Sequence, residues 1–131
     1  MLTLVRVVAA LTAVAFCAVL HAQTYPNKVI RIIVPYPPGG GADITARPIA
    51  QMLSERWGQP VVIENRGGAS GMIGADIVAK APPDGYTIMV SASAEVALNV
   101  ALFPKMPYDP VKDFAPITLA TVTPLALVVH P

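Results

Sequence analysis

The sequence predicts a three-layer α/β domain built on a mainly parallel β-sheet. Short apolar, β-branched runs alternate along the chain with segments whose apolar residues have helical spacing. The first run, Val29–Val34, is apolar at nearly every position, which is typical of a strand covered on both faces. Small residues follow three of the expected strands. In a parallel sheet these loops meet at one edge, where ligands bind.

Residues 1–22 differ from the rest of the chain and have the pattern of a secretory signal peptide. Arg6 supplies a positive charge before the uncharged apolar run Val7–Leu20, and Ala22 is small enough to precede a cleavage site. The alternative is a membrane anchor, but the run is shorter than the ~20 residues that a spanning helix needs. We therefore expect residues 1–22 to be removed and residues 23–131 to be exported to the periplasm.

The composition of the exported part excludes several classes of function. Removal of Arg6 leaves eight basic and eight acidic residues, a balance that favours neither nucleic acid nor an anionic membrane surface. The one cysteine, Cys17, leaves with the signal segment, so we expect no disulfide and no thiol chemistry.

The first strand leads through a glycine-rich loop into a helix. Pro35 ends the strand, and Asp43 is expected to cap the N-terminus of the helix through its carboxylate. Gly58 is expected to end the helix in a left-handed conformation, while Pro48 predicts a late start or a bend. The apolar stripe expected to be buried consists of Ile44, Ile49, Met52, Leu53 and Trp57.

The remaining pattern continues the alternation of strands and helices. The expected elements are a strand at Pro60–Glu64, a helix at Ser70–Ala81, a strand at Tyr86–Ser91, a helix at Ala94–Leu102, and two strands at Ala115–Thr121 and Leu125–Val129. The second helix is expected to bury Ile73, Ile77, Val78 and Ala81.

The first loop holds three consecutive glycines, Gly39, Gly40 and Gly41, after two prolines. Backbone N–H groups without side chains, next to the positive end of a helix dipole, form a site for a carboxylate or a phosphate. The alternative is a tight turn, which one glycine would satisfy. Neither a dinucleotide fingerprint nor a P-loop is present.

Two later loops offer partners for this anion site. Ala69 and Ser70 lie in the second loop, while Ser91, Ala92 and Ser93 form the third. The alternative for the second loop is close packing of its following helix on the sheet through Gly71 and Gly74. The third could equally be an ordinary connection.

Catalytic and metal-binding patterns are missing from the sequence. His21 and His130 lie near the two ends, and there is neither a nucleophile elbow nor a cluster of metal-ligand residues. The carboxylates are expected to be solvated on helix faces and turns. We therefore predict no enzyme, no cofactor and no metal. An α/β enzyme domain that binds a phosphorylated substrate is the alternative, with Glu64 as its ribose-binding carboxylate.

Several motifs together indicate a family. They are Tyr25-Pro26-Asn27-Lys28, Ile33 to Asp43, Arg56 to Arg66, Gly68-Ala69-Ser70-Gly71, Pro83 to Thr87, and Pro107 to Phe114. From Tyr25 to Pro131 the chain resembles the Bug receptors, the substrate-binding receptors of tripartite tricarboxylate transporters. The resemblance implies an exported protein that holds a small carboxylate, largely through main-chain groups, and delivers it to membrane permease subunits.

The resemblance also implies a class II periplasmic-binding-protein-like fold, with two α/β lobes around a cleft. Residues 23–131 would form the N-terminal part of lobe one and end near the crossover to lobe two, so a fragment is expected. A non-functional truncated remnant is a further alternative. Family members often have a Thr-Gly type of sequence at the third loop, so Ser91-Ala92-Ser93 is a departure that leaves its side-chain contacts open.

Overall fold

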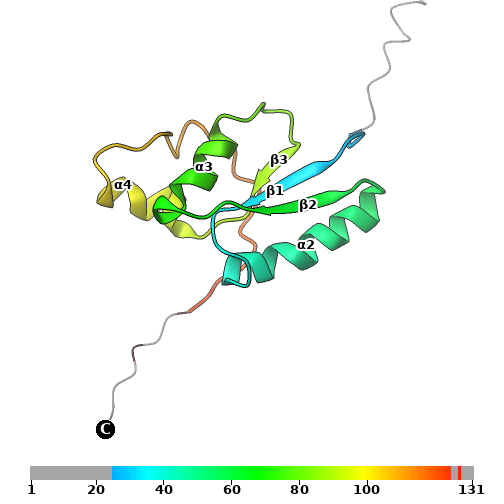
Figure 1. Ribbon diagram of the computed structural model, residues 1–131, viewed down its shortest axis with the longest axis horizontal. Coiled ribbons are helices and arrows are strands. Elements are labelled where there is room, and N and C mark those ends of the chain that lie inside the picture. Colours follow the sequence, from blue (N-terminus) through cyan, green and yellow to red (C-terminus); the bar gives the residue numbers. More distant parts are fainter. Residues whose placement is uncertain (1–24, 125–126, 128–131) are drawn as a thin grey trace, which may run out of the picture.

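A small parallel sheet forms the centre of the computed structural model, which describes residues 25–124 and 127. Its strands are β1 (Ile30–Val34), β2 (Val61–Asn65) and β3 (Thr87–Met89), in the order β2-β1-β3 (Figure 1). Both pairings are parallel, with Ile32 opposite Ile63 on one side and Ile88 on the other. The predicted α/β class and the parallel sheet are therefore confirmed for these strands.

Helices cover the two faces of this sheet. Helix α2 (Gly41–Trp57) connects β1 to β2, and the short 3-10 turn η1 (Ala69–Gly71) leads into α3 (Met72–Ala79). Figure 1 shows α2 and α3 on opposite sides of the strands. After β3 the chain forms a π-helical turn, η2 (Ala94–Leu98), which continues into α4 (Asn99–Leu102).

The core lies between β1 and α2, where small helix residues face large strand residues. Ile32 and Val34 pack with Ala46 and Ala50, and all four are buried. The predicted stripe was partly wrong, since Ile44 is 63% exposed and Met52 is 60% exposed. The two alanines let α2 lie close to β1. The larger apolar residues Ile44 and Met52 then lie on the sides of the helix, away from the sheet.

Helix α3 shows the same effect with even smaller residues. Gly74 and Ala75 are buried against the sheet, while Ile73, which was expected in the core, is 50% exposed. A Cβ on Gly74 would lie 2.8 Å from both the Arg66 carbonyl oxygen and Pro35 Cβ. Only glycine allows this approach, so the packing interpretation of this glycine is correct.

The ends of α2 differ in how well the sequence predicted them. The helix begins at Gly41 with Gly40 as its N-cap, so the prediction that Asp43 is the cap was wrong. Asp43 lies inside the first turn, and its carboxylate reaches back to the loop. At the other end Gly58 has φ 64°, which confirms the left-handed stop, and the helix continues through Pro48.

Aromatic side chains close the sheet edge opposite to the loops. The Tyr25 ring packs edge-on against Trp57 and Tyr86, with centroid distances of 6.1 and 5.0 Å. The Tyr25 hydroxyl donates to the Gly85 carbonyl at 2.8 Å, and the Lys28 ammonium lies 4.3 Å from the centroid of the Tyr86 ring. These contacts tie the start of the described chain to the end of α2.

The segment after Phe114 departs from the prediction. The expected strand Ala115–Thr121 is an unpaired stretch, and its apolar side chains Ile117 and Leu119 are 76% and 77% exposed. Alternating apolar residues make a strand only where a free strand edge pairs with them. The expected strand Leu125–Val129, apart from Leu127, and the expected signal segment 1–22 lie outside the described residues. Within the described chain, no helix has the length and apolarity to cross a membrane.

Candidate functional site

The three loops meet at the carboxyl edge of the parallel sheet. The Asn65 side-chain amide at the end of β2 donates to the Tyr36 carbonyl, after β1, at 3.1 Å. A Cβ on Gly67 would lie 3.4 Å from Pro37 Cδ, so the second loop packs directly on the first. The Tyr36 hydroxyl in turn lies beside the backbone of Ala92 in the third loop. Side chains and backbone therefore hold the three loops in one group.

A buried carboxylate organises the first loop. Asp43 is 1% exposed, and its oxygens accept hydrogen bonds from the Gly39 N–H at 2.9 Å and from the Asn65 amide at 3.0 Å. Arg47 adds two more, at 2.9 and 3.1 Å. The Gly39 N–H first, then Arg47 and Asn65, lower the pKa of Asp43 to about 2. Asp43 is therefore an anion that closes the loop.

This network decides which glycine amides of the first loop can face a ligand. The Gly39 N–H is engaged by Asp43, whereas the Gly40 N–H has only a long bond of 3.4 Å to the Pro37 carbonyl. Gly41 is the first residue of α2, where an N–H has no partner inside the helix. Gly40 and Gly41 are thus the better placed donors of the three.

The second loop has an unusual backbone. Gly68, Ala69, Ser70 and Gly71 all have positive φ, with values of 49° and 54° at the two non-glycine residues. The left-handed region costs an L-residue roughly 1–2 kcal/mol. Strain of this kind concentrates at functional sites. Ala69 and Ser70, the predicted site residues, therefore lie on a strained and exposed turn at the start of α3.

The third loop leads into the helical segment that was expected at residues 94–102, but its buried polar residues were not predicted. Ser91 is half-buried while Ala92 and Ser93 are exposed. Beyond them, Glu95 and Asn99 are 0% and 1% exposed.

The Asn99 side chain donates to the Ser70 carbonyl at 2.9 Å, and a Cβ on Gly71 would overlap the Glu95 carboxyl. The predicted packing role of Gly71 is therefore against this helical segment rather than against the sheet.

The expectation that the carboxylates are solvated was thus wrong for Glu95, and Asp43, expected as the helix cap, is buried as well. Burial, the dominant effect, raises the pKa of Glu95, although the Tyr36 hydroxyl lies beside its carboxyl. Two polar residues four apart in the otherwise apolar stretch of residues 94–102 were the available signal. That spacing places both on one side of a helix.

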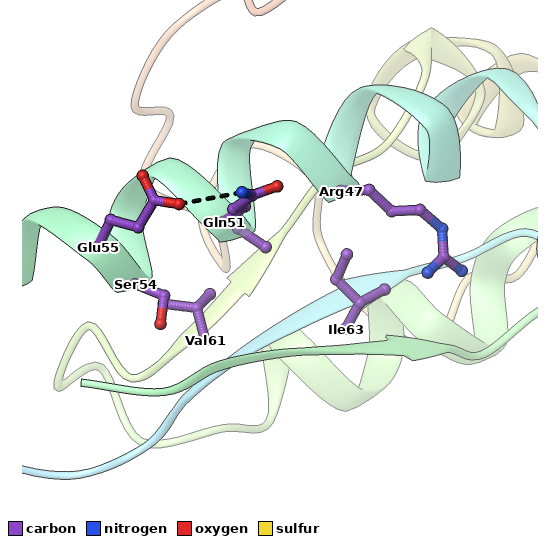
Figure 2. A pocket seen from close by; sticks show the side chains of 7 residues that line it. Arg47, Gln51, Ser54, Glu55, Val61 and Ile63 are labelled. Carbon is purple, nitrogen blue, oxygen red and sulfur yellow. Dashed lines mark hydrogen bonds between the residues drawn. The ribbon is translucent and has the colours of Figure 1, made fainter. Parts of the chain in front are cut away.

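Two hollows of the surface lie beside the loops. A groove of about 580 Å³ runs between α2 and β2. Figure 2 shows the Gln51–Glu55 hydrogen bond along its helix side and Val61 and Ile63 of β2 facing the helix. A second hollow of about 300 Å³ includes Ala69 but no other predicted site residue. These two hollows therefore do not coincide with the loop cluster.

Glu64, the ribose-binding carboxylate of the alternative enzyme hypothesis, is bound to two arginines. Glu64 accepts hydrogen bonds from Arg31 at 2.6 and 3.1 Å and from Arg66 at 2.9 and 3.2 Å. Arg31 first and then Arg66 lower the pKa of Glu64 to about 2. No group of three His, Cys, Asp or Glu residues that could hold a metal occurs among the residues described.

A parallel α/β unit with small-residue loops gathered at its carboxyl edge is the architecture of a periplasmic-binding-protein lobe. The chain matches the model of the tripartite tricarboxylate transporter family receptor over residues 45–131, and it belongs to that family. This is a family of solute-binding receptors. The resemblance found in the sequence motifs is thereby confirmed.

Curated relatives support the same assignment. Protein BugT of Bordetella pertussis is 45% identical over 115 residues, which are 87% of this chain and 35% of that protein. A UPF0065 protein from the tcbD-tcbE intergenic region of a Pseudomonas species is 44% identical over 107 residues, 82% of this chain and 32% of the relative. The chain thus spans about a third of the length of the curated relatives it matches.

Solved structures with bound ligands share the fold. MatC of Rhodopseudomonas palustris, with bound malate, is 42% identical with a TM-score of 0.69, over 73% of this chain and 33% of that one. A second R. palustris protein, solved with adipate, is 44% identical with a TM-score of 0.64, over 66% and 29% of the two chains.

Proposed function

We propose that this chain forms the N-terminal part of a solute-binding receptor that captures a small carboxylate at its three loops. The proposed site residues are those expected from the sequence: Gly39, Gly40, Gly41, Ala69, Ser70, Ser91, Ala92 and Ser93. The observation that carries the proposal is the gathering of these loops at one sheet edge by hydrogen bonds and close contacts. Two similar structures hold malate and adipate, both dicarboxylates.

Neutral donors explain how such a site holds an anion without a buried cation. The amides of Gly40 and Gly41 lie at the start of α2, whose dipole is positive at that end. A hydrogen bond to a charged acceptor contributes roughly 1.5–3 kcal/mol. Arg47 of α2 is bound to Asp43 by an ion pair, so its charge is already compensated.

The test removes one amide donor of the first loop. Gly40 has φ −75°, which proline also adopts, so Gly40→Pro deletes the N–H; the Pro37 carbonyl, which accepts the long 3.4 Å bond from Gly40, must shift to admit the ring. Gly40→Ala is the matched control, because it keeps the N–H and its Cβ would lie 3.5 Å from the Pro37 carbonyl oxygen. Calorimetry with malate, adipate and the neutral ester dimethyl malate measures binding.

We expect malate or adipate to bind, the ester to bind at least tenfold more weakly, and Gly40→Pro to lower the affinity by roughly tenfold or more. Gly40→Ala should stay within about twofold of the parent chain. Equal binding of the ester, or an equal loss in Gly40→Ala, would show that the amide does not hold a carboxylate.

The family also suggests where the receptor acts and with what. We propose a periplasmic location, with residues 1–22 as the export signal and the permease subunits of the transporter as partners. A fusion of residues 1–22 to an alkaline phosphatase, which is active only after export, tests the signal. Phosphatase activity equal to that of an unexported fusion would contradict it.

A further inference from the structure

The helical segment after the third loop, residues 94–102, buries its polar side chains and exposes its apolar ones. Glu95 and Asn99 are 0% and 1% exposed, whereas the apolar residues between and beyond them are 44–69% exposed; these are Val96, Leu98, Val100 and Leu102. This inverts the usual amphipathic order. The first turn is also a π-helix, a rare geometry that is frequent at functional sites.

Glu95 lies where all three loops meet. Its carboxyl packs on Gly71 of the second loop, and the Tyr36 hydroxyl of the first loop and the Ala92 backbone of the third lie beside it. Its own carbonyl accepts a hydrogen bond from the Tyr108 hydroxyl at 2.8 Å. One side chain therefore touches every loop of the proposed site.

No charge compensates this carboxyl within residues 25–124. Neither oxygen has a hydrogen-bond partner of good geometry there, and none of the ion pairs in that range includes Glu95. The titratable groups that face it are two tyrosines, Tyr36 and Tyr108, and Asp76 of α3 adds negative charge near Tyr108. An ionised carboxylate is costly in such surroundings unless it is paired.

Several features would favour the anion: the dipole of α3, whose N-cap is Gly71, the place of Glu95 in the first turn of its own helical segment, and the Tyr36 hydroxyl and backbone groups nearby. The dipole of α3 is weak here, since α3 has eight residues and the Gly71 N–H already donates to the Gly68 carbonyl at 3.0 Å. Desolvation is the larger effect on the Glu95 carboxyl, ahead of its nearby hydrogen-bond donors. The neutral form of the carboxyl is therefore the one that fits the closed arrangement.

We propose that Glu95 is a positioning residue whose protonated carboxyl holds the three loops together, so that capture of a carboxylate is coupled to uptake of one proton from solvent. The positioning part stands on the contacts of Glu95 alone. The coupling part rests on the proposed function, because an anion at the loops and an ionised Glu95 behind them repel each other. Affinity for a carboxylate then falls as Glu95 ionises.

The test begins without any ligand. The chain holds only three glutamates, Glu55, Glu64 and Glu95, so carbon NMR of a glutamate-labelled 131-residue chain resolves each carboxyl during a pH titration. We expect the Glu95 carboxyl to titrate above 4.5, with the amides of Ser70, Gly71 and Ala92 following the same midpoint. Glu95→Gln, which mimics the neutral form, should remove that inflection from the loops, and Glu55→Gln, at an exposed site, should leave it.

Two results overturn the positioning role: a Glu95 carboxyl that titrates at its ordinary value, or loop amides that ignore its titration. The titration of the unaltered chain decides this even where Glu95→Gln does not fold.

A second arm adds malate between one pH unit below and two above the midpoint. Calculated for fully ionised malate, the affinity should fall up to tenfold per unit above the midpoint in the parent chain and stay flat in Glu95→Gln. A flat profile in the parent overturns the coupling. If the loops follow Glu95 but no carboxylate binds, the proposed function fails and the positioning role stands.

Discussion

Asp43 and Glu95 are two buried carboxyls at the same edge of the sheet, and their surroundings give them opposite properties. Asp43 is surrounded by donors from Gly39, Arg47 and Asn65, which hold its pKa at about 2. Glu95 has a tyrosine hydroxyl and backbone beside it and, within residues 25–124, no paired cation, and burial raises its pKa. Donors of the surrounding chain, rather than burial alone, decide whether a covered carboxyl is an ion.

The loops that the two acids support differ in the same way. The first loop is closed from within, because its own glycine amide binds Asp43. The second holds Ala69 and Ser70 in the left-handed region and is held from outside, by Asn99 on the Ser70 carbonyl and by Glu95 against Gly71. We therefore expect the first loop to keep its shape alone and the second to depend on the helical segment behind it.

The largest effect is expected from Gly71→Ala, which places a Cβ into the Glu95 carboxyl at a position with φ 82°. Left-handed strain and overpacking together should lower the free energy of unfolding by roughly 3 kcal/mol. Gly58→Ala is the control, since it has φ 64° but open space around it, and it should cost about 1 kcal/mol. Urea denaturation measures both, and equal losses would show that Glu95 does not fill the space beside Gly71.

Asp43→Asn should give the next largest loss. The replacement keeps the shape but removes the charge that Arg47 and the Gly39 N–H bind, and it turns an amide toward other donors. Its denaturation midpoint should fall clearly below that of Arg47→Gln, because Arg47 is 58% exposed and can be replaced by water. A midpoint for Asp43→Asn equal to that of the parent chain would refute the role of the anion in closing the loop.

Asp43 and Glu95 should also affect the pH dependence of stability in opposite directions. The pKa of folded Asp43, about 2, lies below its ordinary 3.8, so its contribution is complete above about pH 4 and is lost as the pH falls toward 2. The pKa of folded Glu95 lies above its ordinary 4.5, so the folded state binds more protons there and stability falls as the pH rises above 4.5.

Glu95→Gln should therefore abolish the loss of stability above pH 4.5 and raise the free energy of unfolding at pH 8 by about 1 kcal/mol. The loss of stability at acid pH should persist, with Glu64, whose pKa is also about 2, contributing to it. Denaturation midpoints from pH 2 to pH 8 provide the profile. If stability still falls above pH 4.5 in Glu95→Gln, a group other than Glu95 causes that fall.

The smallest effect is expected from Glu55→Gln, the same chemical change at an exposed position of α2. Glu55 accepts a hydrogen bond from Gln51 at 2.9 Å on the helix surface. Its replacement should change the free energy of unfolding by no more than about 0.5 kcal/mol at any pH between 5 and 8. A change as large as that of Glu95→Gln would show that burial is not the reason for the difference.

Strand and loop positions were predictable because they depend on local chemistry. The apolar run at β1 and the glycine at 58 each specify one conformation, and the parallel sheet follows from alternation with helices. The core of α2 was missed because helical spacing shows which residues share a face but not how closely that face approaches the sheet. Ala46 and Ala50 allow a closer approach than Ile44 and Met52.

The sequence predicted the loops of the candidate site but not the buried side chains that hold these loops in place. Glycine and serine at strand ends mark the loops directly in the sequence. Asp43 was assigned to the cap because a capping position and the first turn differ by only a few residues. The support from Glu95 and Asn99 depends on the placement of residues 94–102 against the second loop, which only the folded chain establishes.

Trp57 gives the molecule a convenient optical probe. It is the only tryptophan of the chain, it packs on Tyr25, and it ends the helix that begins at the glycine loop. At ~1.5 Å per residue the two ends of α2 are about 24 Å apart. Its fluorescence should follow global unfolding and remain unchanged when a solute reaches the loops, so one emission signal reads stability without interference from binding.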